Sequence, residues 1–150
     1  MSTSPERIAR IECQVGDDPR LIAGASVIVA HVARRAGLSG GAATEIALAA
    51  SDSCSAAFHA LREPEWSWTA IKLGAAEFPD HIEVTIEPLL EKSKAAGGRF
   101  SSMLPADFTD KIRAKLKNAA LDGFDVGLRD GIPRITLVKC TGAAKRRFVV

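Results

Sequence analysis

The chain has 150 residues, of which 47% are hydrophobic and 25% are charged, and its formal net charge at pH 7 is +2. This length and composition are typical of one globular domain that can bury a hydrophobic core. The charge is too small to predict binding to nucleic acid or to a membrane surface, and no apolar run approaches the roughly 20 residues that span a bilayer.

The cysteines and the first residues indicate a reducing compartment. Cys13, Cys54 and Cys140 are odd in number and far apart, without the close spacing of a zinc site or a redox motif. We interpret them as small buried hydrophobic residues. The first ten residues, MSTSPERIAR, lack the apolar core of a signal peptide, so we expect a cytoplasmic protein.

The chain begins with a strand and a helix. Residues 1–6 are expected to be disordered, and the alternation of apolar and polar residues over 7–15 predicts a half-buried strand. Asp18 can cap a helix whose first position is Pro19, and Gly37 ends that helix after about Ala36. Its predicted core face consists of Leu21, Ile22, Ala25, Ile28, Val29, Val32 and Ala33.

A second helix and two strands follow. The helix is predicted from about Ala42 to Leu61, because apolar residues recur there at spacings of three and four. Residues 66–75 and 81–87 are predicted to form two strands that are joined by a turn. Pro88 is expected to break the second of these strands.

The remaining chain contains a long loop, a helix and a hairpin. Residues 88–106 are charged and contain glycine, which predicts a loop that is long for a compact domain. A third helix is predicted from about Asp107 to Leu121, ended by Gly123, and residues 124–128 and 134–139 are predicted to form a closing hairpin. Residues 7–141 are thus one expected domain, followed by a basic tail at 142–150.

The order β, α, α, β, β, loop, α, β, β predicts the fold class. Strand pairs are adjacent in the sequence, and each helix has one apolar arc. We therefore predict an α+β two-layer sandwich, with helices on one face of a mainly antiparallel sheet.

The second helix also carries a polar stripe. Ser51, Ser55 and His59 recur every four residues, and Asp52 lies beside them. The stripe is either a functional site, the relic of one, or the solvated side of a helix. A serine and a histidine four apart on a helix are not a hydrolase arrangement, because they lack the strained turn and the oxyanion donors that activate a serine.

Four segments together resemble the GHKL (Bergerat-fold) ATPases, and most of all their anti-sigma-factor serine/threonine kinases, also called switch kinases. The segments are DDPRLIAGASVIVAHVARRAGLS, TEIALAASDSCSAAFHA, HIEVTIEP and LDGFDVGLRDGIPRITLVK, and they cover most of residues 7–141. The resemblance implies the Bergerat fold, a nucleotide site beside the second helix, and a role in transcription regulation by partner switching. It also implies homodimerisation, which is common in the family.

The ATP motifs that the resemblance implies are damaged in this sequence. The second helix of the family supplies a glutamate, then an asparagine that ligates magnesium, then a histidine. Aligning on His59 places Ser51 and Ser55 at the first two positions, whereas a shift by one residue places Asp52 and Ala56 there. Serine cannot act as a general base near neutral pH, and alanine offers magnesium no ligand.

The other two motifs depart as well. Glu87 and Pro88 stand where the family has an adenine-binding aspartate followed by glycines, and the expected glycine-rich turn at 101–107 contains no glycine. Lys94 and Arg99 flank a Gly-Gly pair that could hold a phosphate, although such a pair is weak evidence.

These observations predict a regulatory protein that binds a sigma factor or a STAS-type antagonist with little or no ATP chemistry. No cofactor and no metal site are expected. The alternative is a divergent but active ATP-dependent kinase, with ATP and magnesium as cofactors, Ser51 or Asp52 as catalytic candidates, and Ser55, His59, Glu87, Lys94 and Arg99 as nucleotide-binding candidates. A third hypothesis is an unrelated α+β domain with a small-molecule pocket beneath the 88–106 loop.

Overall fold

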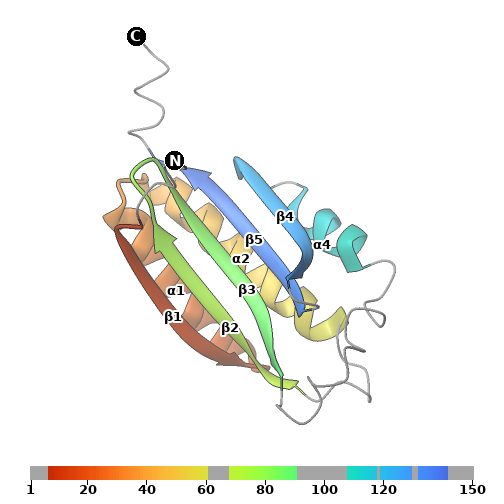
Figure 1. The fold of residues 1–150 in the computed structure, drawn as a ribbon. Helices are drawn as coiled ribbons and strands as arrows, with labels where there is room; N and C mark the ends of the chain where they lie inside the picture. Colours follow the sequence, from red (N-terminus) through yellow and green to blue (C-terminus); the bar gives the residue numbers. More distant parts are fainter. Residues whose placement is uncertain (1–6, 61–67, 91–107, 118, 130–131, 142–150) are drawn as a thin grey trace, which may run out of the picture.

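A computed structural model describes residues 7–60, 68–90, 108–117, 119–129 and 132–141. It has two layers, with the helices behind one face of a sheet (Figure 1). The predicted fold class and element order are confirmed. The elements are β1 (Ala9–Gly16), α1 (Pro19–Arg35), α2 (Gly40–Ala60), β2 (Trp68–Glu77), β3 (His81–Leu90), α4 (Phe108–Leu116), β4 (Gly123–Arg129) and β5 (Ile132–Cys140).

The sheet has five strands in the order β1-β2-β3-β5-β4, and every neighbouring pair is antiparallel. Side chains alternate between a core face, which the helices cover, and an open face on the other side. The register aligns Cys13, Leu73 and Ile86 on the core face, and Gln14, Lys72 and Glu87 on the open face.

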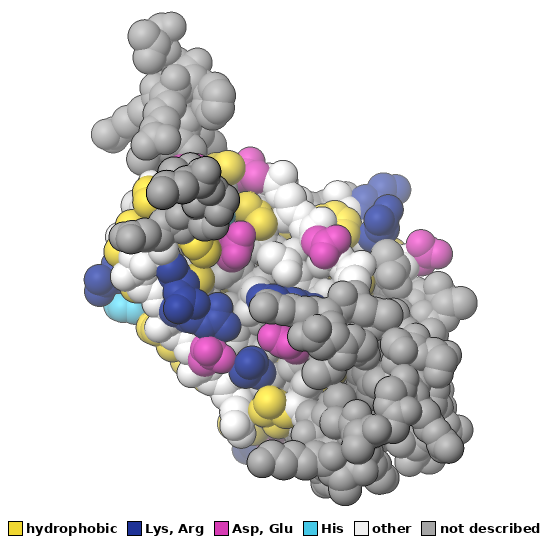
Figure 2. All heavy atoms as spheres, viewed as in Figure 1, with side chains coloured by type: hydrophobic (Ala, Val, Ile, Leu, Met, Phe, Trp, Pro, Cys, Tyr) yellow, Lys and Arg dark blue, Asp and Glu magenta, His cyan; other side chains and the backbone are white. Residues whose placement is uncertain are grey.

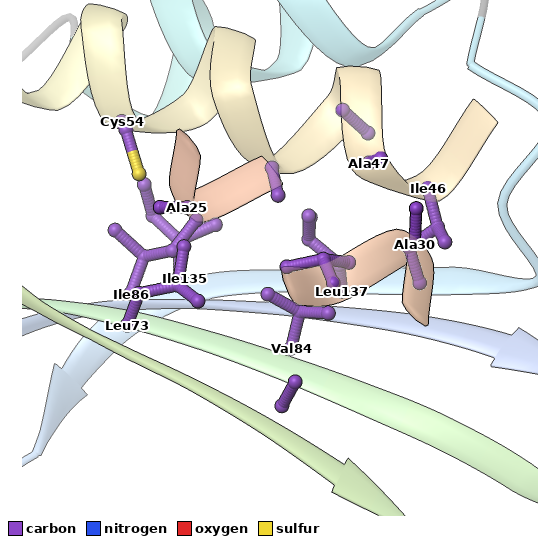
Figure 3. Close-up of a cluster of buried hydrophobic side chains, with 14 of the residues drawn as sticks. Ala25, Ala30, Ile46, Ala47, Cys54, Leu73, Val84, Ile86, Ile135 and Leu137 are labelled. Carbon is purple, nitrogen blue, oxygen red and sulfur yellow. The ribbon is translucent and has the colours of Figure 1, made fainter. Parts of the chain in front are cut away.

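The core lies between the sheet and the helices. Figure 3 shows side chains of α1 and α2 meeting those of the strands, among them Ile46, Leu73, Val84 and Leu137, none of which is more than 1% exposed. The helices contribute small residues to this contact. Their buried alanines are Ala25, Ala30 and Ala33 in α1, and Ala43, Ala47, Ala49, Ala50 and Ala57 in α2.

The predicted limits of α1 are confirmed. The side chain of Asp18 accepts a hydrogen bond from the backbone N–H of Arg20 at 2.9 Å, and Pro19 occupies the first turn. Gly37 has φ of 101°, a left-handed conformation that glycine adopts at no steric cost, so the helix stops there. The hydrogen bond from the Arg20 side chain lowers the pKa of Asp18 and keeps the cap ionised.

The prediction that Pro88 breaks its strand is wrong, because β3 continues to Leu90. Pro88 is opposite Ile71 in the β2–β3 pairing, whereas the β3–β5 pairing ends at Ile86 and Ile135. Beyond Ile86 the strand is therefore paired on one side only, and proline is tolerated where its missing N–H needs no ladder partner. Residues 91–107, most of the predicted long loop, lie outside the described residues, as do the termini at 1–6 and 142–150.

The third helix is shorter than predicted, since α4 ends at Leu116 rather than near Leu121. The backbone after it is used elsewhere: the N–H of Ala119 bonds to the carbonyl of Leu116 at 3.0 Å, and the N–H of Asp122 bonds to the carbonyl of Val138 at 3.0 Å. The carboxylate of Asp122 also accepts the N–H of Cys140 at 2.6 Å. These bonds commit the chain to the sheet before a further helical turn can form.

Some predicted burials also differ. Leu21 is 54% exposed, although it was assigned to the core face of its helix; it lies at the margin of the buried arc, beside the end of β1 at Gly16. Of the three cysteines, which form no disulfide, Cys54 is buried, whereas Cys13 and Cys140 are half-buried. In the described part of the chain, every helix is too short or too polar to cross a membrane.

Candidate functional site

A groove of about 620 Å³ lies between α2 and α4. Ser55 and Ala56 line its α2 side, together with His59 one turn further along the helix. Lys111, Ala114 and Lys115 line its α4 side. The lining therefore combines small side chains with one imidazole and two lysines.

Two buried residues of α4 hold this helix in its place beside α2. Ile112 and Leu116 are 0% and 3% exposed and belong to the hydrophobic core. They are four residues apart, so they anchor one side of a short helix that would be unstable alone. Lys111 and Lys115 have the same spacing one position earlier, which turns both toward α2.

A second, smaller hollow of about 220 Å³ continues along α2. It is lined by Glu45, Leu48, Ala49 and Asp52 from α2, and by Lys115, Ala119 and Ala120 on the other side. Lys115 lines both hollows, so they are neighbours. The charges differ along this surface: two carboxylates lie at the end near the start of α2, and lysines and His59 lie at the other.

A buried lysine beneath the second hollow links β5 to α2 and to the segment that follows α4. Lys139 of β5 is on the core face of the sheet, with its side chain 9% exposed. Its ammonium donates a hydrogen bond to the carbonyl of Ala120 and lies 3.7 Å from a carboxylate oxygen of Glu45. Burying a lysine is costly unless its charge is paired and hydrogen-bonded, and both conditions are met here.

The structure gathers part of the predicted site. Asp52, Ser55 and His59 all line these hollows, and all three are exposed. Ser51 lies on the same helix but is half-buried and contributes to neither hollow. Lys94 and Arg99, the two phosphate-binding candidates, are outside the described residues.

Glu87 lies elsewhere. It is on the open face, where its carboxylate is 4.0 Å from the ammonium of Lys72, and Lys72 is also 3.7 Å from Glu12. Figure 2 shows this face, with acidic and basic side chains interspersed over the strands. The sheet therefore separates Glu87 from Ser55 and His59.

His81 is the first residue of β3. It is half-buried in the β2–β3 turn, with its ring nitrogens 2.6 Å from Asp80 and 3.3 Å from Glu83. Its ring also stacks on Phe78, with centroids 4.6 Å apart. These contacts give His81 a structural role in the turn.

Three lysines in or beneath these hollows were not singled out by sequence reasoning. Lys139 follows Ile135 and Leu137 at every second residue, so its place on the core face was available from the pattern. Lys111 and Lys115 flank Ile112 and Leu116, but the sequence does not specify which helix packs beside them. Within the described ranges, no three His, Cys, Asp or Glu side chains are grouped as they would be to hold a metal ion.

Comparison with known proteins does not assign the chain to a family. The sequence matches no protein-family model, and no curated protein matches it either.

Proposed function

We propose that the chain is a regulatory protein-binding domain that resembles the anti-sigma serine kinases and acts with little or no ATP chemistry. In this proposal the partner is a sigma factor or a STAS-type antagonist, and the contact surface is the groove between α2 and α4. The order of elements supports the proposal, as does the placement of Ser55 and His59 on that groove and of Asp52 on the neighbouring hollow.

The observation that carries the proposal is the chemistry of the groove. Ala56 and Ala114 give it an apolar lining, and His59, Lys111 and Lys115 add basic side chains to that lining. A groove lined by both alanines and basic side chains suits an amphipathic helix that presents acidic side chains, because such a helix buries its apolar stripe and pairs its carboxylates with the basic groups.

The residues at the positions that phosphoryl transfer would need also support a protein with little or no ATP chemistry. Ser55 or Ala56, depending on the alignment, stands where the family has a magnesium ligand, and Glu87 is on the opposite side of the sheet from both. Asp52 and Lys115 share the smaller hollow, which is the feature that favours the alternative of a divergent kinase.

Magnesium-ATP separates the two functions. A ligand at a hundred times its Kd adds roughly 2.7 kcal/mol to the unfolding free energy, which raises Tm by roughly 5–10 °C for a domain of this size. We expect no shift of Tm when magnesium-ATP is added to the protein. A shift of several degrees would favour the kinase and contradict the proposal.

Charge reversal on α4 tests the groove itself. We expect the Lys111→Glu/Lys115→Glu variant to lose capture of a sigma factor or STAS protein from cells of the source organism. The matched control is Arg113→Glu/Lys117→Glu, which makes the same charge change, with the same spacing, at exposed residues that do not line the groove. Equal loss in both variants, or in neither, contradicts a role for the groove, provided that all the proteins melt alike.

A further inference from the structure

The groove and the smaller hollow form one continuous crease beside α2. Lys115 lines both of them, and the wall opposite α2 runs from Lys111 to Ala120. The α2 wall runs from Glu45 at one end to His59 at the other. At about 1.5 Å per residue this stretch of helix is about 21 Å long, which is roughly four turns. The crease can therefore take a helix that lies along α2 rather than across it.

Exposed side chains of α2 form one row along this crease. The row consists of Glu45, Leu48, Asp52, Ser55 and His59, which are all exposed and are spaced by three or four residues. Leu48 is apolar and yet 59% exposed, and it lies between the two carboxylates of the row. A helix packed along the row would bury Leu48, and removing an apolar side chain from water favours binding.

Asp52 determines which charge the row attracts at its centre. Within the described part of the chain, its carboxylate has no hydrogen bond and no ion pair. Glu45 differs, because one of its carboxylate oxygens is 3.7 Å from the buried ammonium of Lys139. A helix that is acidic along its whole length would bring like charges together at Asp52, whereas a basic side chain would be attracted there.

The smaller hollow suits side chains rather than a whole small molecule. Its volume is about 220 Å³, whereas ligand pockets usually measure about 300–1,000 Å³. Leu48, Ala49, Ala119 and Ala120 contribute apolar groups to its lining. An apolar side chain of a docked helix would therefore fit here.

We propose that one helix of the partner lies along the whole crease and that its charges are segregated. Its acidic residues face Lys111 and Lys115, an apolar residue packs on Leu48, and a basic residue pairs with Asp52. This inference rests on the proposed function, which assigns the groove to an acidic amphipathic helix, and it adds the apolar and basic half of that helix. The partner is thereby distinguished from helices that are acidic throughout, since these are repelled at Asp52.

Synthetic helical peptides of about 16 residues, long enough to span the crease, test the inference. All share one apolar stripe. One peptide is acidic throughout, and the segregated peptides have one acidic half and one basic half, in either order. Calorimetric titration of the full chain measures each Kd. We expect the better segregated peptide to bind at least about fivefold more tightly than the acidic one, because a repulsive contact is replaced by an attractive one.

Variants of the row locate the contact. Asp52→Lys should weaken the segregated peptide by about fivefold and strengthen binding of the acidic peptide. Leu48→Ala should weaken the segregated peptide by about tenfold. The matched control is Asp125→Lys, which makes the same charge change at an exposed residue of β4 outside the crease, and it should alter neither Kd. Opposite shifts of the two peptides cannot come from damage to the fold.

The outcomes separate this inference from the proposed function. The inference is overturned if the segregated peptide binds no more tightly than the acidic one, if Asp52→Lys shifts both peptides alike, or if Leu48→Ala changes nothing. In those cases the groove keeps its assigned role, provided that the acidic peptide binds and Lys111→Glu/Lys115→Glu abolishes this binding. If neither peptide binds, or if that charge reversal has no effect on the acidic peptide, the role of the groove in the proposed function is contradicted as well.

Discussion

Gly74 is the position where adding one carbon should have the clearest effect on stability. It lies in β2 between Glu12 of β1 and Thr85 of β3. A Cβ at this position would be 2.8 Å from Nη2 of Arg10 and 2.8 Å from Oγ1 of Thr85. Arg10 is long enough to move away, but Thr85 is short, 4% exposed and fixed in a central strand. The substitution Gly74→Ala therefore forces the sheet or Thr85 to shift.

The magnitude follows from two opposing effects. Overpacking typically costs about 1–3 kcal/mol, and replacing glycine by alanine in a regular element gains roughly 0.5–1 kcal/mol. We expect Gly74→Ala to lower the free energy of unfolding by about 1–2 kcal/mol, and Tm by roughly 3–8 °C. Urea denaturation at fixed protein concentration measures the first quantity, and calorimetry measures the second.

Two controls make this prediction decisive. Gly24→Ala adds the same methyl group in α1, where nothing lies within 4 Å, so it should raise stability by up to about 1 kcal/mol. In a Thr85→Ala background the cost of Gly74→Ala should shrink, because the fixed obstacle is gone. The reasoning is refuted if Gly74→Ala is as stable as the parent chain, or if its cost is the same in both backgrounds.

Two further predictions concern α2. Ser39 accepts a hydrogen bond from the N–H of Ala42 at 3.2 Å, so Ser39→Ala should cost about 1 kcal/mol in urea denaturation, whereas Ser39→Asp should cost little. The pKa of Cys54 is raised to about 12, first by burial and then by Cys13. The thiol ionises at lower pH in the unfolded chain than in the folded one, so the free energy of unfolding is unaffected below about pH 9 and falls between about pH 9 and 12. From pH 8 to pH 10 the wild type should therefore lose about 1.4 kcal/mol more of its unfolding free energy than Cys54→Ala does. Equal losses in the two proteins would refute this assignment.

The elements of the fold could be predicted because each has one dominant local signal. Asp18, Pro19 and Gly37 mark the limits of α1, and alternation marks β1. The predictions that were wrong concern features that depend on residues distant in the sequence. The effect of Pro88 depends on where β5 stops pairing with β3, and the length of α4 depends on bonds that Asp122 makes with Val138 and Cys140 of β5.

The candidate site could be predicted on α2 alone. Periodicity on one helix placed Asp52, Ser55 and His59 on a common side, which the structure retains. The lysines across the groove belong to another helix, and nothing local states that the two helices face each other. Glu87 shows the converse case, because its position in the chain suggested a shared site, whereas the strand alternation directs it to the open face.

The buried alanines of α2 have a consequence for how this protein tolerates substitution. Helix α2 packs against α1 on one side and α4 on the other. Ala47 and Ala50 are buried in the close-packed core, so a larger residue at either position has nowhere to expand except by pushing α2 away from its neighbours. The wall that carries Ser55 and His59 would move with α2. The width of the groove is thus set partly by residues that never touch its occupant, and variants there are a way to tune binding from a distance.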